Sequence, residues 1–327
     1  MCTCATQVYE RVVTMKNNPF VSIVILNYKR RDTLIKVLES SLRQNYPLLE
    51  VIVVDNGSGD GTVEFLEENY PDVRTVALEK NIGCAGRNKG IEAARGDVVV
   101  TIDNDVYFDS ADEVVKIVRF FDRHPDAACV SFKVHNPYTG GLHARDWCHP
   151  RDYREYSEKE FETYYIPEGA SAFRKEALDE VGGYYEPLFI GCEGYDLALR
   201  MIDRGYKIMY TPDVLVWHSM EPETRESWRP YYYYTRNYFW IAWKDYRFFS
   251  GLRYIVPKIS MMLYFSVRTK FVKYFFKGVF DGLANLGMVS RDSTRIKRET
   301  EEKIKALAVF RPGLLSRFRK HLAKPQI

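Results

Sequence analysis

Three short runs of aliphatic, largely β-branched residues in the first third of the chain each end in a polar loop. They cover residues 21–26, 49–54 and 98–102, and a weaker run covers 73–78. Runs that are apolar throughout are typical of parallel strands buried on both faces. Apolar residues at helical spacing lie between them, for example over 34–42. The pattern therefore predicts right-handed βαβ units and a mostly parallel α/β sheet.

Two carboxylates follow the last of these runs directly, as Asp103 and Asp105 with Asn104 between them. Carboxylates that converge at a strand end repel each other unless a cation neutralises them, and hard oxygen ligands of this kind suit Mg²⁺ or Mn²⁺. Open α/β sheets bind their ligands at the carboxyl ends of their strands. An isolated pair would be a solvated turn, but its position after a buried run favours a cation site.

Two glycine-rich loops lie between the runs. The loop over 55–62 holds three glycines and several short polar side chains. Such residues cannot pack a core, but they can form a tight turn whose backbone and carboxylates face a ligand. The loop over 81–90 holds three more glycines and leads into a helix that we expect over 91–94.

These segments carry a family resemblance. The sequences VSIVILNYKRRDTL, VIVVDNGSGDGT and NIGCAGRNKGIEAARGDVVVTIDNDV resemble the donor half of family 2 glycosyltransferases, and residues 169–178, 181–184 and 189–200 resemble the acceptor half. The resemblance covers about residues 20–220 and implies the GT-A (nucleotide-diphosphosugar transferase) fold, a mostly parallel α/β sheet flanked by helices. The chain is most similar to the bacterial or archaeal polysaccharide and glycolipid type, rhamnosyltransferases included.

We expect three segments, of which the resemblance covers the middle one. Residues 1–19 are a lead segment, and its charged Glu10 and Arg11 do not fit a signal peptide. Residues 20–227 are the catalytic domain, with a donor half over about 20–110 and an acceptor half over about 111–227. Residues 228–327 are a helical extension rich in basic and aromatic side chains.

By this resemblance the donor is a UDP- or dTDP-linked sugar. The residues expected to bind it are Asn27, Tyr28, Arg30, Asp55, Gly83, Arg87, Asn88, Asp103 and Asn104. Asp55 would accept a hydrogen bond from the base, since a carboxylate is an acceptor only and suits the N–H of uracil or thymine. Alternatively, Asp55 caps its own turn, and Arg87 belongs to a structural ion pair.

The resemblance makes Asp105 the direct metal ligand, with His218 completing the metal shell as in some relatives. The cation, Mn²⁺ or Mg²⁺, would neutralise the departing nucleoside diphosphate. An imidazole ligand suits Mn²⁺ better than Mg²⁺. The alternative for His218 is a half-buried side chain with no ligand.

The general base is expected at the start of a helix in the acceptor half, where inverting relatives carry an acidic motif. The string here is Glu193-Gly194-Tyr195-Asp196, so glycine stands where those relatives have the catalytic Asp. Glu193 is the favoured base because it lies nearer the cleft, and Asp196 is the second candidate. A structural pair between Asp196 and Arg200 at i+4 is the alternative for that carboxylate. A retaining enzyme would also tolerate the glycine.

The extension is strongly basic, with 21 Lys and Arg against six Asp and Glu, and 20 of the chain's 48 aromatic residues lie between 228 and 280. This composition is typical of an amphipathic helix on an anionic membrane surface. Its longest uncharged stretch over 259–277 has nine residues, whereas a spanning helix needs about 20. The expected location is cytoplasmic, on the inner face of the cell membrane. Packing on the catalytic domain or a homo-oligomer are alternatives, and nucleic acid is not an expected partner.

The sequence therefore predicts a metal-dependent glycosyltransferase. It would transfer a sugar, with inversion, to a hydroxyl group of a lipid-linked or polysaccharide acceptor. Aromatic residues such as Tyr164 and Tyr165, between the metal motif and the acceptor motif, are candidate platforms for that acceptor. The alternatives are a retaining enzyme, or a protein that binds nucleotide sugar or lipid without turnover. A nucleotidyltransferase does not fit, because no glycine follows the first run within 27–30.

Overall fold

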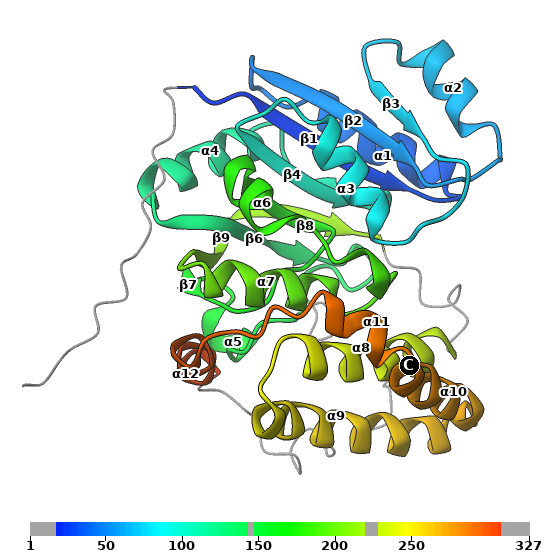
Figure 1. Cartoon of the computed structure of the whole chain (residues 1–327). Coiled ribbons are helices and arrows are strands. Elements are labelled where there is room, and N and C mark those ends of the chain that lie inside the picture. The colour runs from blue at the N-terminus through cyan, green and yellow to red at the C-terminus, as the bar shows by residue number, and fades with distance from the viewer. Residues whose placement is uncertain (1–17, 143–146, 220–227, 309–327) are drawn as a thin grey trace, which may run out of the picture.

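The structure is a computed structural model that describes residues 18–142, 147–219 and 228–308 (Figure 1). The lead segment, apart from its last two residues, and residues 309–327 of the extension lie outside this part of the chain. Among the described residues, no helix is both long and apolar enough to cross a membrane.

One sheet runs through both halves of the catalytic domain. Its strands are β1 (Val21–Asn27), β2 (Leu49–Asp55), β3 (Arg74–Ala77), β4 (Val98–Asp103), β5 (Val106–Phe108), β6 (Ala127–His135), β7 (Phe161–Glu162), β8 (Ala170–Arg174) and β9 (Lys207–His218). They are ordered β3-β2-β1-β4-β8-β6-β9-β5, and β7 pairs with β9. The donor half is parallel from β3 to β4. In the acceptor half β8 is antiparallel to both of its neighbours, and β5 and β7 are antiparallel to β9.

Helices cover both faces of this sheet. They are α1 (Arg31–Leu42), α2 (Thr62–Asn69), α3 (Ala85–Ala93), α4 (Glu113–Arg123), α5 (Tyr153–Tyr156), α6 (Lys175–Val181), the 3₁₀ turn η1 (Glu186–Leu188) and α7 (Glu193–Asp203). Alternate strand residues enter two separate cores. Ile23 and Ile25 pack with α1 and α4 on one face, whereas Val24 packs with α3, α6 and α7 on the other. Because both faces of the sheet are buried, the sequences of the strands are unbroken apolar runs. The predicted α/β fold is confirmed.

Helix α3 begins six residues earlier than the sequence predicts, at Ala85 rather than Ile91. Two glycines inside it explain the difference. A Cβ atom at Gly86 would lie 2.7 Å from Leu26 Cδ1, and one at Gly90 would overlap Val24 Cγ1. These glycines therefore let the helix pack directly onto β1, and close packing outweighs their low helix propensity.

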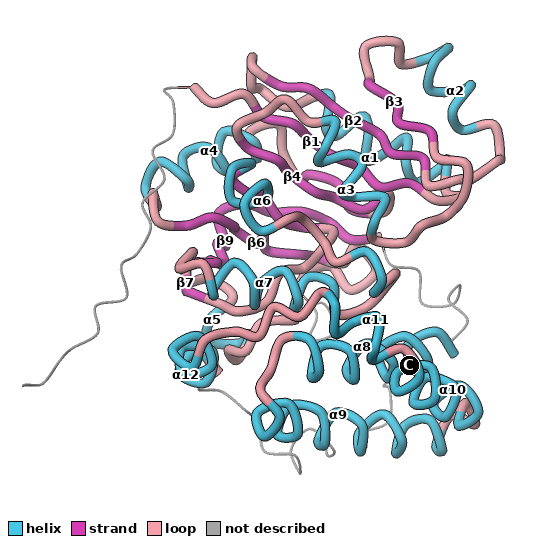
Figure 2. Tube along the Cα trace, viewed as in Figure 1, coloured by secondary structure: helices cyan, strands magenta, loops and turns pink. Residues whose placement is uncertain are grey.

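The extension consists of helices and loops, as Figure 2 shows. Its helices are α8 (Trp228–Lys244), α9 (Phe248–Arg268), α10 (Val272–Ala284), α11 (Leu286–Arg291) and α12 (Arg298–Leu307). Helix α8 packs against the catalytic domain, where the Asn237 amide donates to the carbonyl oxygens of Leu188, Ile190 and Gly191 at 3.1, 3.0 and 2.6 Å. The Arg236 guanidinium donates to Leu188 O at 2.7 Å. The extension is thus joined to the loop that precedes α7.

The chain then returns to the acceptor half. At the start of α12 the Lys297 backbone N–H and the Thr300 hydroxyl both donate to Asp203 Oδ1 at 2.7 Å. Lys303 forms an ion pair with Glu162 at 2.6 Å. Ile304 is buried in the same core as α7. Packing on the catalytic domain, which the sequence offered as one alternative for the extension, is therefore present.

Candidate active site

The ends of β1, β2 and β4 bring the donor-half polar residues together. The register pairs Asn27 with Asp55 and Leu26 with Asp103. The buried Asn27 amide links three loops, since its Nδ2 donates to Asp55 Oδ1 at 2.9 Å and its Oδ1 accepts from Asn104 Nδ2 at 2.8 Å. The convergence expected from three apolar runs with polar ends is therefore present.

Asp55 also makes the contacts of a turn cap. Its Oδ2 accepts from the Ser58 backbone N–H at 3.0 Å, and its Oδ1 accepts from the Ser58 hydroxyl at 2.5 Å. These bonds hold the first glycine-rich loop, and they match the capping alternative. Base recognition by Asp55 stays a prediction. A role for Tyr28, which follows Asn27 and is exposed, also stays a prediction.

Gly83 and Asn88 hold the donor half to the acceptor half. A Cβ atom at Gly83 would overlap the Phe189 carbonyl oxygen, which accepts from the Cys84 backbone N–H at 2.7 Å. The Asn88 amide makes a two-way pair with Tyr184, donating to its carbonyl and accepting from its N–H, each at 2.8 Å. These contacts give both residues a structural role, and donor binding by them stays a prediction.

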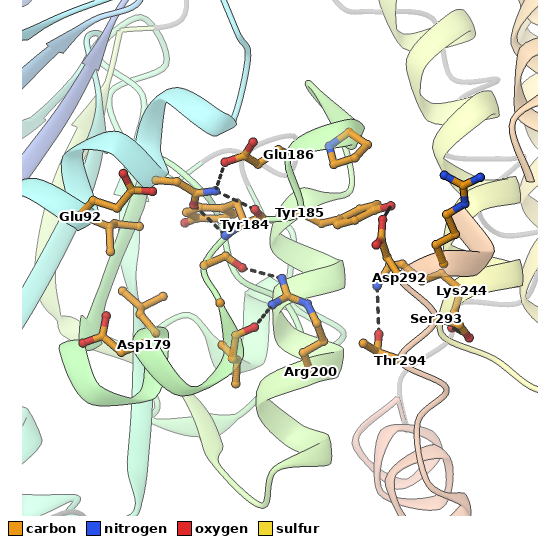
Figure 3. A pocket seen from close by; sticks show the side chains of 18 residues that line it. Glu92, Asp179, Tyr184, Tyr185, Glu186, Arg200, Lys244, Asp292, Ser293 and Thr294 are labelled. Carbon is orange, nitrogen blue, oxygen red and sulfur yellow. Dashed lines mark hydrogen bonds between the residues drawn. The ribbon is translucent and has the colours of Figure 1, made fainter. Parts of the chain in front are cut away.

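The Asn88 pair lies on the wall of a cavity of about 780 Å³ between α3, α6, α7 and α11 (Figure 3). Figure 3 also shows Arg200 and Tyr185 bonded within this wall. Neither Asp105 nor His218 lines this cavity, and neither do Glu168 and Glu193. Its volume alone therefore does not mark it as the reaction site.

Asp105 and His218 are brought together by the antiparallel pairing of β5 with β9, in which Val106 lies opposite His218. His218 Nε2 is 3.5 Å from Asp105 Oδ1, and Arg30 Nη1 is 2.5 Å from Asp105 Oδ2. The described residues include no group of three or more His, Cys, Asp and Glu side chains suited to hold a metal ion. One carboxylate and one imidazole nevertheless fit a cation that takes its remaining ligands from substrate phosphates and water.

Arg87 is buried and forms an ion pair with Asp103 at the end of β4. Burial by itself would lower the pKa of Arg87, but the carboxylate of Asp103, followed by Tyr184, Glu193 and Glu168, outweighs this and raises it. The guanidinium therefore stays charged. The ion-pair alternative for Arg87 is present in the structure, and a phosphate contact stays a prediction.

Glu168 is the site residue that the sequence reasoning missed. It lies just before β8, and its Oε1 accepts from the Gly194 backbone N–H at the start of α7 at 2.8 Å. The Thr101 hydroxyl on β4 donates to its carbonyl oxygen at 2.9 Å. The glycine at position 194 could have indicated such a residue, because an acidic motif that lacks one carboxylate suggests that another segment supplies it.

Gly194 leaves no space for any side chain. A Cβ atom there would overlap the Ile166 carbonyl oxygen and would lie 2.7 Å from Glu168 Oε1. The carboxylate of Glu168 therefore occupies the start of α7 from a different part of the chain, and it accepts a backbone N–H at the positive end of the helix.

Glu193, the favoured base, begins α7 and is buried. Its Oε2 accepts no hydrogen bond from any described residue. Burial, followed by the like charge of Glu168, raises the pKa of Glu193 to about 8, although Arg87 acts in the opposite direction. Burial also raises the pKa of Glu168. Two carboxylates that cannot both ionise easily are typical of acid–base sites.

Asp196 lies one turn further along α7, completely buried between two cations. Its Oδ2 is 2.7 Å from Arg200 Nη2 and its Oδ1 is 2.6 Å from Lys244 Nζ of α8. Burial would raise the pKa of Asp196, but Arg200 and Lys244 outweigh this and lower it. These contacts favour the structural alternative for Asp196, because an ionised carboxylate held by two cations is a poor proton acceptor.

Comparison with solved structures identifies the fold. Residues 1–349 of S. aureus TarS, in complex with UDP-GlcNAc, match with a TM-score of 0.59 and 16% identity over 92% of each chain. The mannosyltransferase PcManGT from Pyrobaculum calidifontis, in complex with GDP-Man and Mn²⁺, matches with a TM-score of 0.54 and 18% identity over 95% of this chain and 89% of that chain. The sheet and its helices are thus those of GT-A glycosyltransferases.

Sequence comparison identifies the family. The family model for glycosyl transferase family 2 matches residues 22–182. The chain is 31% identical to the uncharacterized glycosyltransferase YwdF of Bacillus subtilis over 198 residues, which are 59% of this chain and 71% of YwdF. It is 24% identical to the O-antigen chain rhamnosyltransferase RfbN of Salmonella typhimurium over 65% of this chain and 70% of that protein. The chain belongs to glycosyltransferase family 2, and it is a glycosyltransferase.

Asp196→Ala should destabilise the protein rather than only inactivate it. Arg200 would lose its carboxylate partner, and the buried Lys244 would lose one of two, since it also pairs with Asp245 at 2.5 Å. Removing one partner of a buried ion pair costs about 3–5 kcal/mol. Chemical unfolding followed by circular dichroism measures this loss. Asp179→Ala is the matched control, because Asp179 makes an exposed i,i+4 pair with Lys175, and such pairs contribute only about 0.3–0.5 kcal/mol. A stable but inactive Asp196→Ala protein would instead assign Asp196 to catalysis.

Proposed function

We propose that this enzyme transfers a sugar from a UDP- or dTDP-sugar to a hydroxyl group of a lipid-linked or polysaccharide acceptor, with inversion at the anomeric carbon. The observation that supports this most is the position of the Glu168–Glu193 pair, which faces the Arg87–Asp103 pair where the donor and acceptor halves meet. Direct displacement by an acceptor hydroxyl requires a general base beside the donor end of the sheet.

In this proposal Asn27 and Asn104 fix the loops around the nucleoside, while Asp55 and Asp103 contact the base and ribose. Asp105 and His218 would hold Mn²⁺ or Mg²⁺ together with the donor phosphates, and the ion would supply charge neutralisation at the departing diphosphate. Arg30, now on Asp105, would move toward the donor phosphates. The neighbours with UDP-GlcNAc, and with GDP-Man and Mn²⁺, support a donor and a cation of this kind.

Glu193 is the proposed base, and Glu168 is its partner. Glu168 receives the Gly194 N–H, which favours its ionised form, whereas no described residue donates to Glu193 Oε2. The pair therefore holds one proton readily, and that proton resides on Glu193 at neutral pH. Loss of this proton yields a carboxylate that can accept the proton of the acceptor hydroxyl.

Asp105→Ala should abolish the gain in nucleotide affinity that Mn²⁺ provides, because it removes the only carboxylate beside His218 among the described residues. Titration calorimetry with UDP and dTDP, in Mn²⁺ and in EDTA, measures this directly. Asp109→Ala is the control, since Asp109 follows β5 and bonds Trp217 instead. Unchanged affinity in Mn²⁺ would show that Asp105 does not hold the cation.

Glu193→Gln should lower transfer by a factor on the order of 10²–10⁴ while UDP binding is kept. In the wild type, kcat/KM should rise with pH through about 8 as Glu193 loses its proton. Glu168→Gln removes a like charge, so the pKa of Glu193 falls and the rise should move to lower pH. If Glu168→Gln abolishes transfer and Glu193→Gln stays active, the two roles are reversed. If the protein binds UDP in Mn²⁺ but neither transfers the sugar nor hydrolyses the donor, the alternative of binding without turnover is supported.

We further propose that the extension binds the anionic inner face of the cell membrane. Helices α9 and α10 expose an apolar face made of Phe249, Leu252, Val256, Phe276 and Phe280. Phe249 is 79% exposed and Phe280 is 71% exposed. Exposed apolar residues of this size, on helices that also carry basic side chains, are typical of helices that lie in a membrane interface.

The double variant Phe249→Gln/Phe280→Gln should lose most of its binding to vesicles that contain phosphatidylserine, measured by flotation. The control Tyr138→Gln removes an aromatic side chain that is 59% exposed in the catalytic half. High salt should weaken wild-type binding only in part, because the inserted aromatic residues are not screened. Point variants are used because a deletion of residues 228–327 would also remove the contacts that Asn237 and Lys244 make with the catalytic domain. A dimer that ignores vesicles and separates in the double variant would make the apolar face an oligomer interface.

A further inference from the structure

A second cavity, of about 570 Å³, lies between the acceptor half and the extension. Two of its lining residues, Cys192 and Tyr195, flank the start of α7, and Tyr165 reaches it from the segment that carries Glu168. The far wall is built by α8, α9 and α12. The volume falls within the range of ordinary small-molecule sites. The cavity therefore adjoins the helix end that carries Glu193.

The walls of this cavity are largely aromatic. Tyr254 of α9 stacks on Tyr195 with ring centroids 5.6 Å apart and planes 4° apart, and it stacks on Tyr246 at 5.1 Å. The hydroxyl groups of Tyr195 and Tyr246 are 2.6 Å apart. Burial raises the pKa of Tyr195 and Tyr254 well above the usual range. These hydroxyls thus stay neutral. Because one hydroxyl of the Tyr195–Tyr246 pair donates to the other, only the accepting hydroxyl of that pair and the hydroxyl of Tyr254 can donate to an anion.

The charged side chains of the cavity are mostly cationic. Arg253 and Lys258 on α9 and Lys305 on α12 line it, and Glu301 is the one acidic side chain among its described lining residues. Glu301 already accepts from the Ser250 hydroxyl at 2.5 Å and lies 3.7 Å from Lys305. Lys258 Nζ lies over the rings of Tyr254 and Tyr238 at 4.7 and 5.2 Å. A cationic group on an aromatic wall suits a phosphate that carries a sugar.

Helix α9 connects this cavity with the apolar face. Arg253 and Pro257 line the cavity, and their neighbours Leu252 and Val256 belong to the exposed apolar face. One helix thus presents an anion-binding edge next to a surface suited to hydrocarbon. An amphiphile whose phosphate joins a sugar to a long apolar chain would contact both the cationic edge and the apolar face. A neutral polysaccharide has no group that matches either surface.

We propose that this cavity binds the phosphate or diphosphate of a lipid-linked acceptor glycan, with the lipid chain along the apolar face and the acceptor sugar directed toward Glu193. This inference rests on the proposed transfer reaction and names its acceptor class. Lys258 and Arg253 contact the phosphate groups, and the tyrosines contact the first sugar.

Farnesyl diphosphate is a suitable probe for the full-length protein, with farnesol and inorganic pyrophosphate as its two separate halves. Calorimetric titrations contain EDTA, so that a cation at Asp105 cannot capture the diphosphate. Farnesyl diphosphate should bind at least tenfold more tightly than either half. Lys258→Met and Arg253→Gln should each weaken it about tenfold, the usual scale for one charge-assisted contact. Arg268→Gln, on the same helix but outside the cavity, should bind like the wild type.

Three results would overturn the inference. Equal binding of farnesyl diphosphate by the wild type, Lys258→Met and Arg253→Gln would exclude the cavity as its site. Pyrophosphate as tight as farnesyl diphosphate would indicate a site for free phosphate, and farnesol as tight would indicate an apolar site. UDP binding in Mn²⁺, measured on the same preparations, distinguishes failure of this inference from failure of the proposed reaction. If the protein binds UDP but not farnesyl diphosphate, only the proposed acceptor class is wrong. If the protein binds neither ligand, the proposed transfer reaction is contradicted as well.

Discussion

The buried guanidinium of Arg87 is the charge on which the proposed reaction site depends. It pairs with Asp103 at the end of β4, and its field acts on Glu168 and Glu193 across the boundary between the two halves. Without this cation, the carboxylates of Asp103, Glu168 and Glu193 would repel one another with no positive charge between them, and that repulsion would reduce the free energy of unfolding. Arg87 reaches this position because Gly86 and Gly90 seat α3 directly against β1. A packing constraint in the donor half thus sets the proton affinity of groups in the acceptor half.

The extension positions the same site from the other side. Asn237 and Arg236 of α8 hold the carbonyls of 188–191, and Phe189 in that segment lies against Gly83. Lys244 pairs with Asp196 on α7. The helix that begins at Glu193 is therefore fixed at its start by the extension and one turn later by a buried cation from it.

Much of this fold could be predicted from the sequence, because strands that are buried on both faces have continuous apolar runs, as in β1, β2 and β4. The convergence of Asn27, Asp55 and Asp103 followed from the same strands. The early start of α3 could not be predicted, since glycines in a polar segment read as a loop until their neighbours are known. Glu168 was equally hidden, because 25 positions separate it from Glu193 and no local pattern links them. Counting charges does not predict the positions of Arg236 and Lys244. In the sequence they are two of many basic residues in the extension, but in the structure both are buried.

The contacts of α8 and α12 have a consequence for engineering. A chimera that joins the catalytic domain of one relative to the helices of another at residue 228 would leave Asp196 with a foreign partner and the 188–191 carbonyls without their donors. The unit that can be exchanged is instead the helical extension together with residues 187–203. Recombination libraries that exchange this unit would vary the proposed acceptor site and the position of the proposed base together.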